Sequence, residues 1–141
     1  TVRTFTDETL DLIEERMREL SHQLSAAFGA TAEFEFQRNY PPTINHSAET
    51  AFARQVMTEV VGPERVELFE ATMGAEDFSF FLQGKPGAYF VIGNGDGVHR
   101  EGGHGLGPCT LHNPSYDFND QLIPLGATLW VNLSKAWLAQ G

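Results

Sequence analysis

The sequence predicts an α/β fold, or an α+β arrangement for a fragment, and three features of its 141 residues point to it. Near the N-terminus, an apolar stripe at helical spacing lies between two segments with the alternating pattern of strands. A β-rich apolar run, AYFVIGN (88–94), is typical of a strand buried on both faces of a sheet. Residues 121–140 carry a broad apolar face at helical spacing.

The N-terminal segment predicts a strand, a helix and a second strand. TVRTF (1–5) has a strand pattern, and Thr6 is placed to cap a helix whose first turn is acidic, which suits the positive end of the helix dipole. Gly29 is the expected C-cap, and TAEFEFQR (31–38) alternates apolar and polar residues. Two strands and one helix are marginal alone, so we expect them to complete a larger sheet whose other strands lie outside this sequence. The expected stripe of the helix consists of Leu10, Ile13, Met17, Leu20, Leu24 and Phe28.

A change of pattern predicts a domain boundary near Pro42. NYPPTINHS (39–47) has two prolines and several turn-forming residues, which is typical of a linker. The chain is therefore divided into 1–42 and 43–141. Ser47 is expected to cap a second helix that ends at Gly62.

The rest of the chain predicts alternating elements that end in a loop and a helix. A short strand is expected at 66–69, a brief helix in AEDFSFFLQG (75–84), and the apolar strand at 88–94. Seven glycines between 93 and 107 exclude a core element and predict a loop. The final helix is expected at 121–140.

Composition excludes several classes of partner. A net charge of −10 and a pI near 4.8 leave few cations for a phosphate backbone or an anionic membrane, so we expect neither nucleic acid nor membrane as a partner. No apolar run approaches the roughly 20 residues of a spanning helix. One cysteine allows no intrachain disulfide, and with no leader pattern at its start the chain fits a cytoplasmic location. The sequence opens on Thr1 and with a strand pattern, so the natural N-terminus is expected upstream.

The stretch HGLGPCTLHNPSYDFND (104–120) holds the most suggestive side chains. Cys109 and His112 are three residues apart and could share a zinc ion, but a closed zinc site needs four ligands and the other histidines form no second pair with a cysteine. Cys109 could also be a nucleophile with His104 or His112 as its base, although a lone cysteine is more often a small buried residue. These alternatives stay open on spacing alone.

Carboxylates near these residues suggest a metal site and its supporting groups. Asp117 follows His112 closely, and Glu76 lies in GAEDF; a ligating histidine usually donates its second nitrogen to a carboxylate or carbonyl. Both acids could equally start helices. Arg3 could clamp a substrate carboxylate or be a solvated strand residue. GNGDG (93–97) resembles a phosphate-binding loop, but it lacks the full spacing and the following helix.

Several of these motifs together resemble one enzyme family. TVRTF, MGAEDFSFF, AYFVIGNGDG, HGLGPCTLHNPSYDFND and LIPLGATLW, in this order, are similar to the C-terminal part of the hippurate hydrolase-like N-acyl-amino-acid amidohydrolases. That family belongs to the aminoacylase-like, zinc-peptidase-type superfamily. The resemblance covers nearly the whole chain.

The resemblance implies a two-domain enzyme with an α/β catalytic domain and an inserted lid that often mediates dimerisation. Residues 1–42 would include the second half of the lid, and 43–141 the closing segment of the catalytic domain. Two divalent metal ions, for which zinc, manganese, cobalt and nickel are candidates, would activate water to attack the amide of a small N-acyl amino acid. The histidine of LHNP, a ligand in the family, maps onto His112, and Cys109 matches no family ligand.

The resemblance also implies that much of the site is absent from this sequence. The family's other metal ligands and its catalytic glutamate precede the lid, so we expect the isolated chain to be inactive. Asp117 and Glu76 are expected to support the metal ligand, and His104 and Arg3 to touch substrate. The alternatives are a non-catalytic fragment or assembly module, which could form a homo-oligomer through lid strands, and the same fold acting on dipeptides or plant-hormone conjugates.

Overall fold

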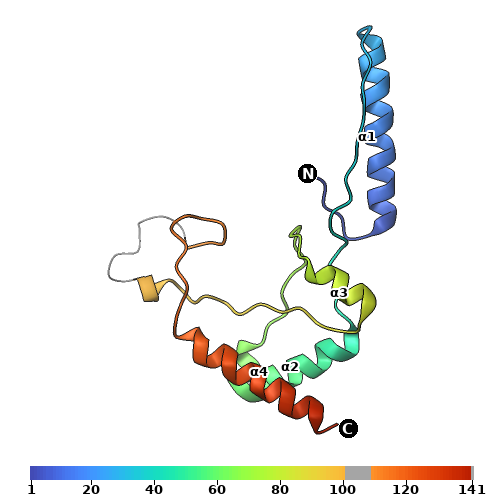
Figure 1. The fold of residues 1–141 in the computed structure, drawn as a ribbon. Coiled ribbons are helices and arrows are strands. Elements are labelled where there is room, and N and C mark those ends of the chain that lie inside the picture. Colours follow the sequence, from blue (N-terminus) through green and yellow to red (C-terminus); the bar gives the residue numbers. More distant parts are fainter. Residues whose placement is uncertain (101–108, 141) are drawn as a thin grey trace. The chain divides into compact units, whose positions relative to one another are not determined.

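The computed structural model describes residues 1–100 and 109–140. These residues form two compact units, one made of Thr1–Thr50 and Leu68–Tyr89 and the other of the described parts of Ala51–Glu67 and Phe90–Gly141. The domain boundary near Pro42 stays a prediction. The helices, with η marking a short 3₁₀ helix, are α1 (Asp7–Ala27), α2 (Ser47–Val61), η1 (Pro63–Arg65), α3 (Phe78–Gly84), η2 (Val98–Arg100) and α4 (Leu122–Leu138) (Figure 1).

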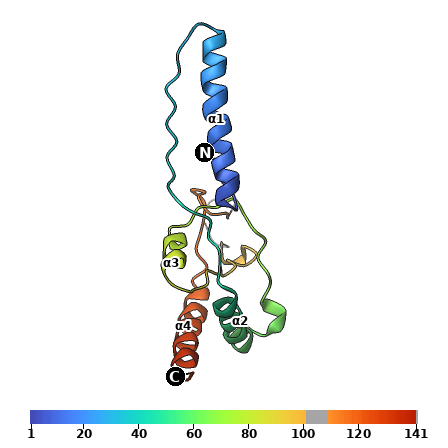
Figure 2. The ribbon, with the colours of Figure 1, turned by 90° about the vertical axis from the view of Figure 1, so that its right-hand side faces the viewer.

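Helix α1 has the N-cap that the sequence predicts, whereas its C-cap is Phe28 instead of the expected Gly29. The Thr6 hydroxyl accepts the backbone N–H of Thr9 at 3.2 Å, and Asp7 and Glu8 occupy the first turn. Gly29 follows the helix with a φ of +69°, the left-handed conformation common at helix ends. The chain then returns beside α1 as an extended segment, residues 30–40 (Figure 2).

The apolar stripe predicted for α1 is largely uncovered within this unit. Leu20 and Leu24 are 64% exposed and Phe28 is 83% exposed. The returning segment lies instead against Glu14 and Arg18, with the Arg18 guanidinium 5.4 Å from the centre of the Phe34 ring. One extended segment is too narrow to cover both sides of a helix, so within this unit Leu10 and Ile13 are half-buried while the later part of the stripe, from Met17 to Phe28, is exposed.

The predicted strands are not found, because the described residues contain no β-strand. This applies to segments 1–5, 31–38, 66–69 and 88–94. The predicted alternation is nevertheless present in part, since Phe34 and Phe36 are half-buried while Glu33 and Glu35 are exposed. A strand exists only when a neighbour completes its backbone ladder, and no described segment supplies that neighbour.

Asn45 and His46 take the place of a strand neighbour for residues 87–89. The Asn45 side chain donates to the carbonyl of Tyr89 at 2.8 Å and accepts the Tyr89 N–H at 2.7 Å. The backbone N–H of His46 donates to the Gly87 carbonyl at 3.0 Å, and the Gly87 N–H donates to His46 Nδ1 at 3.2 Å. We call this pairing the Asn45 clamp; it holds the end of the linker beside the segment that follows α3.

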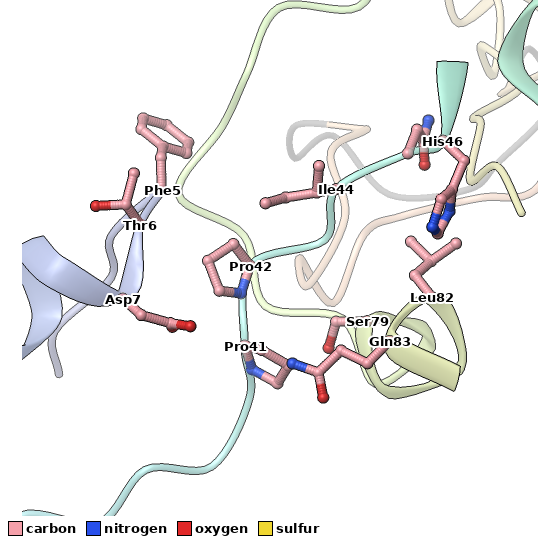
Figure 3. Close-up of a pocket in the computed structure, with 11 residues that line it drawn as sticks. Phe5, Thr6, Asp7, Pro41, Pro42, Ile44, His46, Ser79, Leu82 and Gln83 are labelled. Carbon is pink, nitrogen blue, oxygen red and sulfur yellow. The ribbon is translucent and has the colours of Figure 1, made fainter. Parts of the chain in front are cut away.

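The same unit holds a pocket with a volume of about 230 Å³. Figure 3 shows the residues that line it. The start of α1, the proline-rich linker and α3 surround it, and its walls are mainly apolar, including Phe5, Pro41, Pro42, Ile44 and Leu82. It contains none of the predicted site residues.

The second unit is built on two neighbouring helices, α2 and α4 (Figures 1 and 2). Helix α2 begins at Ser47, which was expected to be its cap, and ends before Gly62 as predicted. Phe52 and Trp137 meet edge to face with ring centres 5.4 Å apart, and Leu129 of α4 is buried. The broad apolar face of the last helix was expected to pack deeply on a sheet; it is covered only in part, because Trp130 and Trp137 stay 63% and 57% exposed and the described residues contain no sheet. Among the described residues, no helix is both long and apolar enough to cross a membrane.

An ion-pair prediction follows from the contact between α1 and the returning segment. Arg38 donates to Glu14 Oε2 through Nε at 2.9 Å and Nη2 at 2.6 Å, and pairs with Asp11 at 2.6 Å. Hydrogen bonds from Arg38, and next from Arg18, hold the pKa of Glu14 below its ordinary value. This contribution to stability is complete above the unfolded-state pKa of Glu14 and is lost as the pH falls through the lower folded-state pKa.

Arg38→Gln should therefore lower the Tm of the chain slightly at neutral pH, and the difference from the unmodified chain should shrink in strong acid and in molar salt. Thermal unfolding followed by circular dichroism measures it. Arg16→Gln is the control, because the pair of Arg16 with Glu19 is exposed at both ends and contributes little. Equal losses for the two variants would contradict the assignment.

Candidate functional site

The candidate site is the loop of residues 109–119 in the second unit, which carries His112. Two consecutive turns shape it: the N–H of Asn113 donates to Thr110 at 3.2 Å, and the N–H of Tyr116 donates to Asn113 at 2.9 Å. The Asn113 side chain accepts the backbone N–H of Ser115 at 3.0 Å and its hydroxyl at 2.6 Å. Asn113 thus joins the two turns through its own backbone and side chain.

His112 has an unusual backbone conformation for a residue other than glycine. Its φ is +65°, and it is the third residue of the turn that begins at Thr110, the position where a type II turn requires a positive φ. Left-handed backbone costs an L-residue with a side chain about 1–2 kcal/mol. Such a conformation persists only where surrounding contacts enforce it, and it is found preferentially at functional sites.

The imidazole of His112 is exposed and accepts or donates no hydrogen bond within the described part of the chain. A ring presented in this way can offer a nitrogen to a metal ion without first breaking an internal hydrogen bond. One imidazole does not make a site, since a catalytic zinc takes about three protein ligands. Within residues 1–100 and 109–140, no three His, Cys, Asp or Glu side chains are grouped to hold a metal. The described residues could therefore supply one ligand, His112, to a metal site whose other ligands would lie elsewhere.

The base of the loop is held by a group of polar contacts around the carbonyl of Asp117. Asn94 Nδ2 donates to this oxygen at 2.7 Å, His99 Nε2 lies 3.0 Å from it, and the Cys109 thiol lies 3.5 Å from it. The N–H of Asn119 donates to Asn94 Oδ1 at 2.9 Å. We call this arrangement the Asn94 clamp; it joins the start and the end of the loop.

The other predicted site residues lie in different parts of the chain. Arg3 and Glu76 lie in the first unit, Arg3 as an exposed residue before α1. His104 lies outside the described residues. Asp117 lies in the same loop as His112, and the contacts described above use its backbone carbonyl. Cys109 is half-buried in the Asn94 clamp. Their proposed roles in the site stay predictions.

Glu76 has a structural role at the start of α3. Its carboxylate accepts the N–H of Phe78 at 3.4 Å and the hydroxyl of Tyr89 at 3.0 Å, and the hydroxyl of the fully buried Ser79 donates to its backbone carbonyl at 2.6 Å. The hydrogen bond from Tyr89, followed by contacts with Asp77 and Phe78, lowers the pKa of Glu76. The same bond is the main cause that raises the pKa of Tyr89.

Sequence reasoning missed the two asparagines that organise these contacts. Asn94 stands at the end of the predicted strand 88–94 and in GNGDG, and Asn45 stands in the linker; neither was predicted to bind distant backbone. Asparagine near glycine or proline signals a turn, but it does not indicate which distant backbone the amide will bind.

Comparison with known proteins identifies the family of this fold and loop. The model of peptidase family M20/M25/M40 matches residues 5–136. The chain belongs to this family. Enzymes of the M20 family hydrolyse amide or peptide bonds and typically use divalent metal ions. Membership fits an α/β peptidase fold, although the described residues form helices without strands.

Curated relatives agree with the resemblance to hippurate hydrolase-like enzymes. The chain is 29% identical over 140 residues to a hippurate hydrolase of Campylobacter jejuni, covering 97% of the chain and 33% of that protein. It is 27% identical over 144 residues to IAA-amino acid hydrolase ILR1-like 4 of Arabidopsis thaliana, covering 99% of the chain and 31% of that protein. A putative amidohydrolase of Bacillus subtilis, YhaA, is 28% identical over 124 residues, which are 87% of the chain and 30% of that protein.

The chain thus spans about a third of the length of these relatives. No solved structure matches it.

The left-handed backbone of His112 predicts an unusual order of stabilities. His112→Gly should be more stable than His112→Val by at least about 1–2 kcal/mol, because glycine adopts a positive φ freely and a β-branched residue does not. Chemical denaturation of the two variants measures the difference. Equal stabilities would contradict the assigned backbone conformation.

The hydrogen bond between Glu76 and Tyr89 predicts a dependence of stability on pH at both ends of the scale. The Glu76 contribution is lost as the pH falls through its lowered pKa, and the Tyr89 contribution is lost as the pH rises through its raised pKa. The Tm difference between the unmodified chain and Tyr89→Phe should be largest at neutral pH and smaller at each extreme. Tyr40→Phe is the control, because Tyr40 is exposed and contacts Phe80 through its ring. A difference that is constant across pH would argue against the bond.

Proposed function

We propose that this chain is the C-terminal part of an amidohydrolase that cleaves the amide bond of N-acyl or aroyl amino acids such as hippurate. Two facts support the proposal: the family match over residues 5–136, and relatives that are named hippurate hydrolase and IAA-amino acid hydrolase. The chain corresponds to about a third of those relatives, so the activity belongs to a longer polypeptide.

His112 is proposed to be the metal ligand that this chain supplies, and its conformation is the observation that carries this assignment. The loop maintains an exposed imidazole at a left-handed position that costs stability, with no internal hydrogen bond to the ring among the described residues. A bound divalent ion would polarise the substrate carbonyl and lower the pKa of water. Nitrogen and oxygen ligands admit zinc, manganese, cobalt or nickel, and the complete enzyme is proposed to hold two ions.

The remaining residues are proposed to act around this ligand. Asp117 and Glu76 would support the metal ligands, and Arg3 and His104 would contact the substrate. The general base and the other ligands would come from sequence upstream of Thr1. A cytoplasmic location stays a prediction from the single cysteine.

A second candidate function is that of an assembly module without catalysis. It is favoured by the exposed stripe of α1 and by the extended segment 31–38, which has no backbone partner among the described residues. Unpaired extended segments are surfaces on which a second copy can add. A homo-oligomer formed through these lid segments is compatible with either function. Action on dipeptides is a further variant of the catalytic proposal. A relative named for peptide cleavage, Thermostable carboxypeptidase 1 of Saccharolobus solfataricus, is 32% identical over 130 residues, which are 90% of the chain and 30% of that protein.

The decisive experiment uses the full-length enzyme. His112→Gly should reduce bound metal after dialysis and lower kcat/KM for hippurate by about 100-fold or more, because it removes a ligand and relaxes the backbone. Elemental analysis and a hydrolysis assay measure the two effects. His22→Ala is the control, because His22 is exposed on α1. Full metal content and unchanged hydrolysis in His112→Gly would remove the assigned role.

The isolated chain tests both candidate functions at once, because neither expects it to be active. With added manganese or zinc it should neither hydrolyse hippurate nor retain a stoichiometric metal after dialysis. Turnover that a chelator abolishes would show a complete site within this chain and would contradict both the partial-site proposal and the assembly module.

A further inference from the structure

We propose that Asn94 is a positioning residue for the His112 loop: its side-chain amide fixes the base of the loop and so sets where the imidazole is presented. The metal-binding part of this inference rests on the proposed function of His112. The positioning itself concerns the protein alone and does not depend on it.

The Asn94 amide makes two hydrogen bonds to one stretch of backbone. Nδ2 donates to the carbonyl of Asp117 at 2.7 Å, and Oδ1 accepts the N–H of Asn119 at 2.9 Å. Donor and acceptor are thus both used, and rotating the amide by half a turn would mismatch both bonds. The Asn94 amide therefore provides residues 117–119 with the hydrogen bonds that a neighbouring strand would provide, and only one orientation of the amide allows both bonds.

The same contacts close the loop at its other end. The carbonyl of Asp117 also lies 3.5 Å from the Cys109 thiol, and Asn94 Nδ2 lies 3.6 Å from that sulfur. Cys109 and Asp117 begin and end the segment that contains His112. The His99 ring, 3.0 Å from the same carbonyl, adds a further contact. The turn that carries His112 and the turn that follows it therefore project from the Asn94 clamp.

The Asn94 clamp is also connected to the start of α4. The Asn119 side chain accepts the N–H of Gln121 at 3.2 Å, and its Nδ2 lies 3.5 Å from the Asn94 carbonyl. The backbone N–H of Leu122, the first residue of α4, donates to the Asn119 carbonyl at 2.9 Å. The loop that carries His112 is consequently attached by hydrogen bonds to the start of α4 as well as to residues 94–99.

This attachment matters because the His112 backbone conformation is costly. Without enforcement, the turn at residues 110–113 would relax away from a positive φ, and the imidazole would move with it. Residues that orient a metal ligand without touching the metal typically change metal affinity by about 10–100-fold when replaced. Asn94 does not touch His112; it acts on it through hydrogen bonds to the backbone of Asp117 and Asn119 at the end of the loop, and we expect an effect in this range.

The test compares two chemically matched variants in the full-length enzyme. Asn94→Asp keeps the size and one acceptor of the side chain but replaces the donor to Asp117 with an oxygen. Asn45→Asp makes the same change in the Asn45 clamp, where the amide also binds a backbone N–H and carbonyl, of Tyr89, at 2.7 and 2.8 Å. Both variants should lose stability to a similar degree, because each loses one backbone hydrogen bond.

Only Asn94→Asp should affect the His112 loop. We expect its metal affinity, measured by competition with a chromophoric chelator for zinc, to fall about 10–100-fold, and that of Asn45→Asp to stay within about twofold. In the metal-free protein, the His112 ring resonances should shift or broaden in Asn94→Asp and stay unchanged in Asn45→Asp. Equal effects of both variants on affinity and ring resonances, or none from Asn94→Asp, would overturn the inference.

A second variant and a measurement that does not depend on metal complete the test. If Asn94→Asp does not fold, Asn94→Ser provides the same test, because its hydroxyl is too short to bridge residues 117 and 119. The ring resonances are independent of metal binding. If His112→Gly retains its metal while Asn94→Asp still moves the His112 ring, the proposed function fails and the positioning role stands; unmoved ring resonances would reject the positioning role itself.

Discussion

In both units of this protein, extended backbone segments need hydrogen-bond partners for their N–H and C=O groups, and the rest of the structure depends on how these are supplied. The described residues contain extended segments but no strand ladder, so their N–H and C=O groups must find other partners or water. Two asparagine side chains meet part of this demand. Asn45 pairs with Tyr89 and Asn94 pairs with residues 117–119, each through one donated and one accepted hydrogen bond. An amide presents the same donor and acceptor as a peptide unit, which is why it can replace one.

These pairings have different consequences in the two units. In the first, the Asn45 clamp attaches the linker to the segment beyond α3, close to the hydrogen bond between Glu76 and Tyr89. In the second, the Asn94 clamp closes the loop that carries His112. A left-handed histidine at the tip of a closed loop is a local loss of stability, which natural proteins retain chiefly where function requires it.

Much of the local structure could be predicted from the sequence. The N-cap of α1, the short helix α3 and the apolar face of α4 follow from spacing and capping residues, which act within a few positions of one another. The family could also be recognised from its motifs, and the match over residues 5–136 confirms it. The strands could not be predicted correctly for the described residues. Alternation shows which side of a segment will be buried, as at Phe34 and Phe36. Whether the segment forms a strand depends on pairing with a second segment.

The sequence by itself determined the family, the helices and the choice of His112 over Cys109 as the residue that matches a family ligand. Only the tertiary structure decided that His112 has a positive φ, that Cys109 lies against the carbonyl of Asp117, and that Asn94 connects the two ends of the loop. The reason is physical. Helix caps and apolar periodicity are local interactions, whereas the Asn94 clamp joins residues 23 and 25 positions apart, and no local pattern specifies the partner of a side-chain amide at that separation.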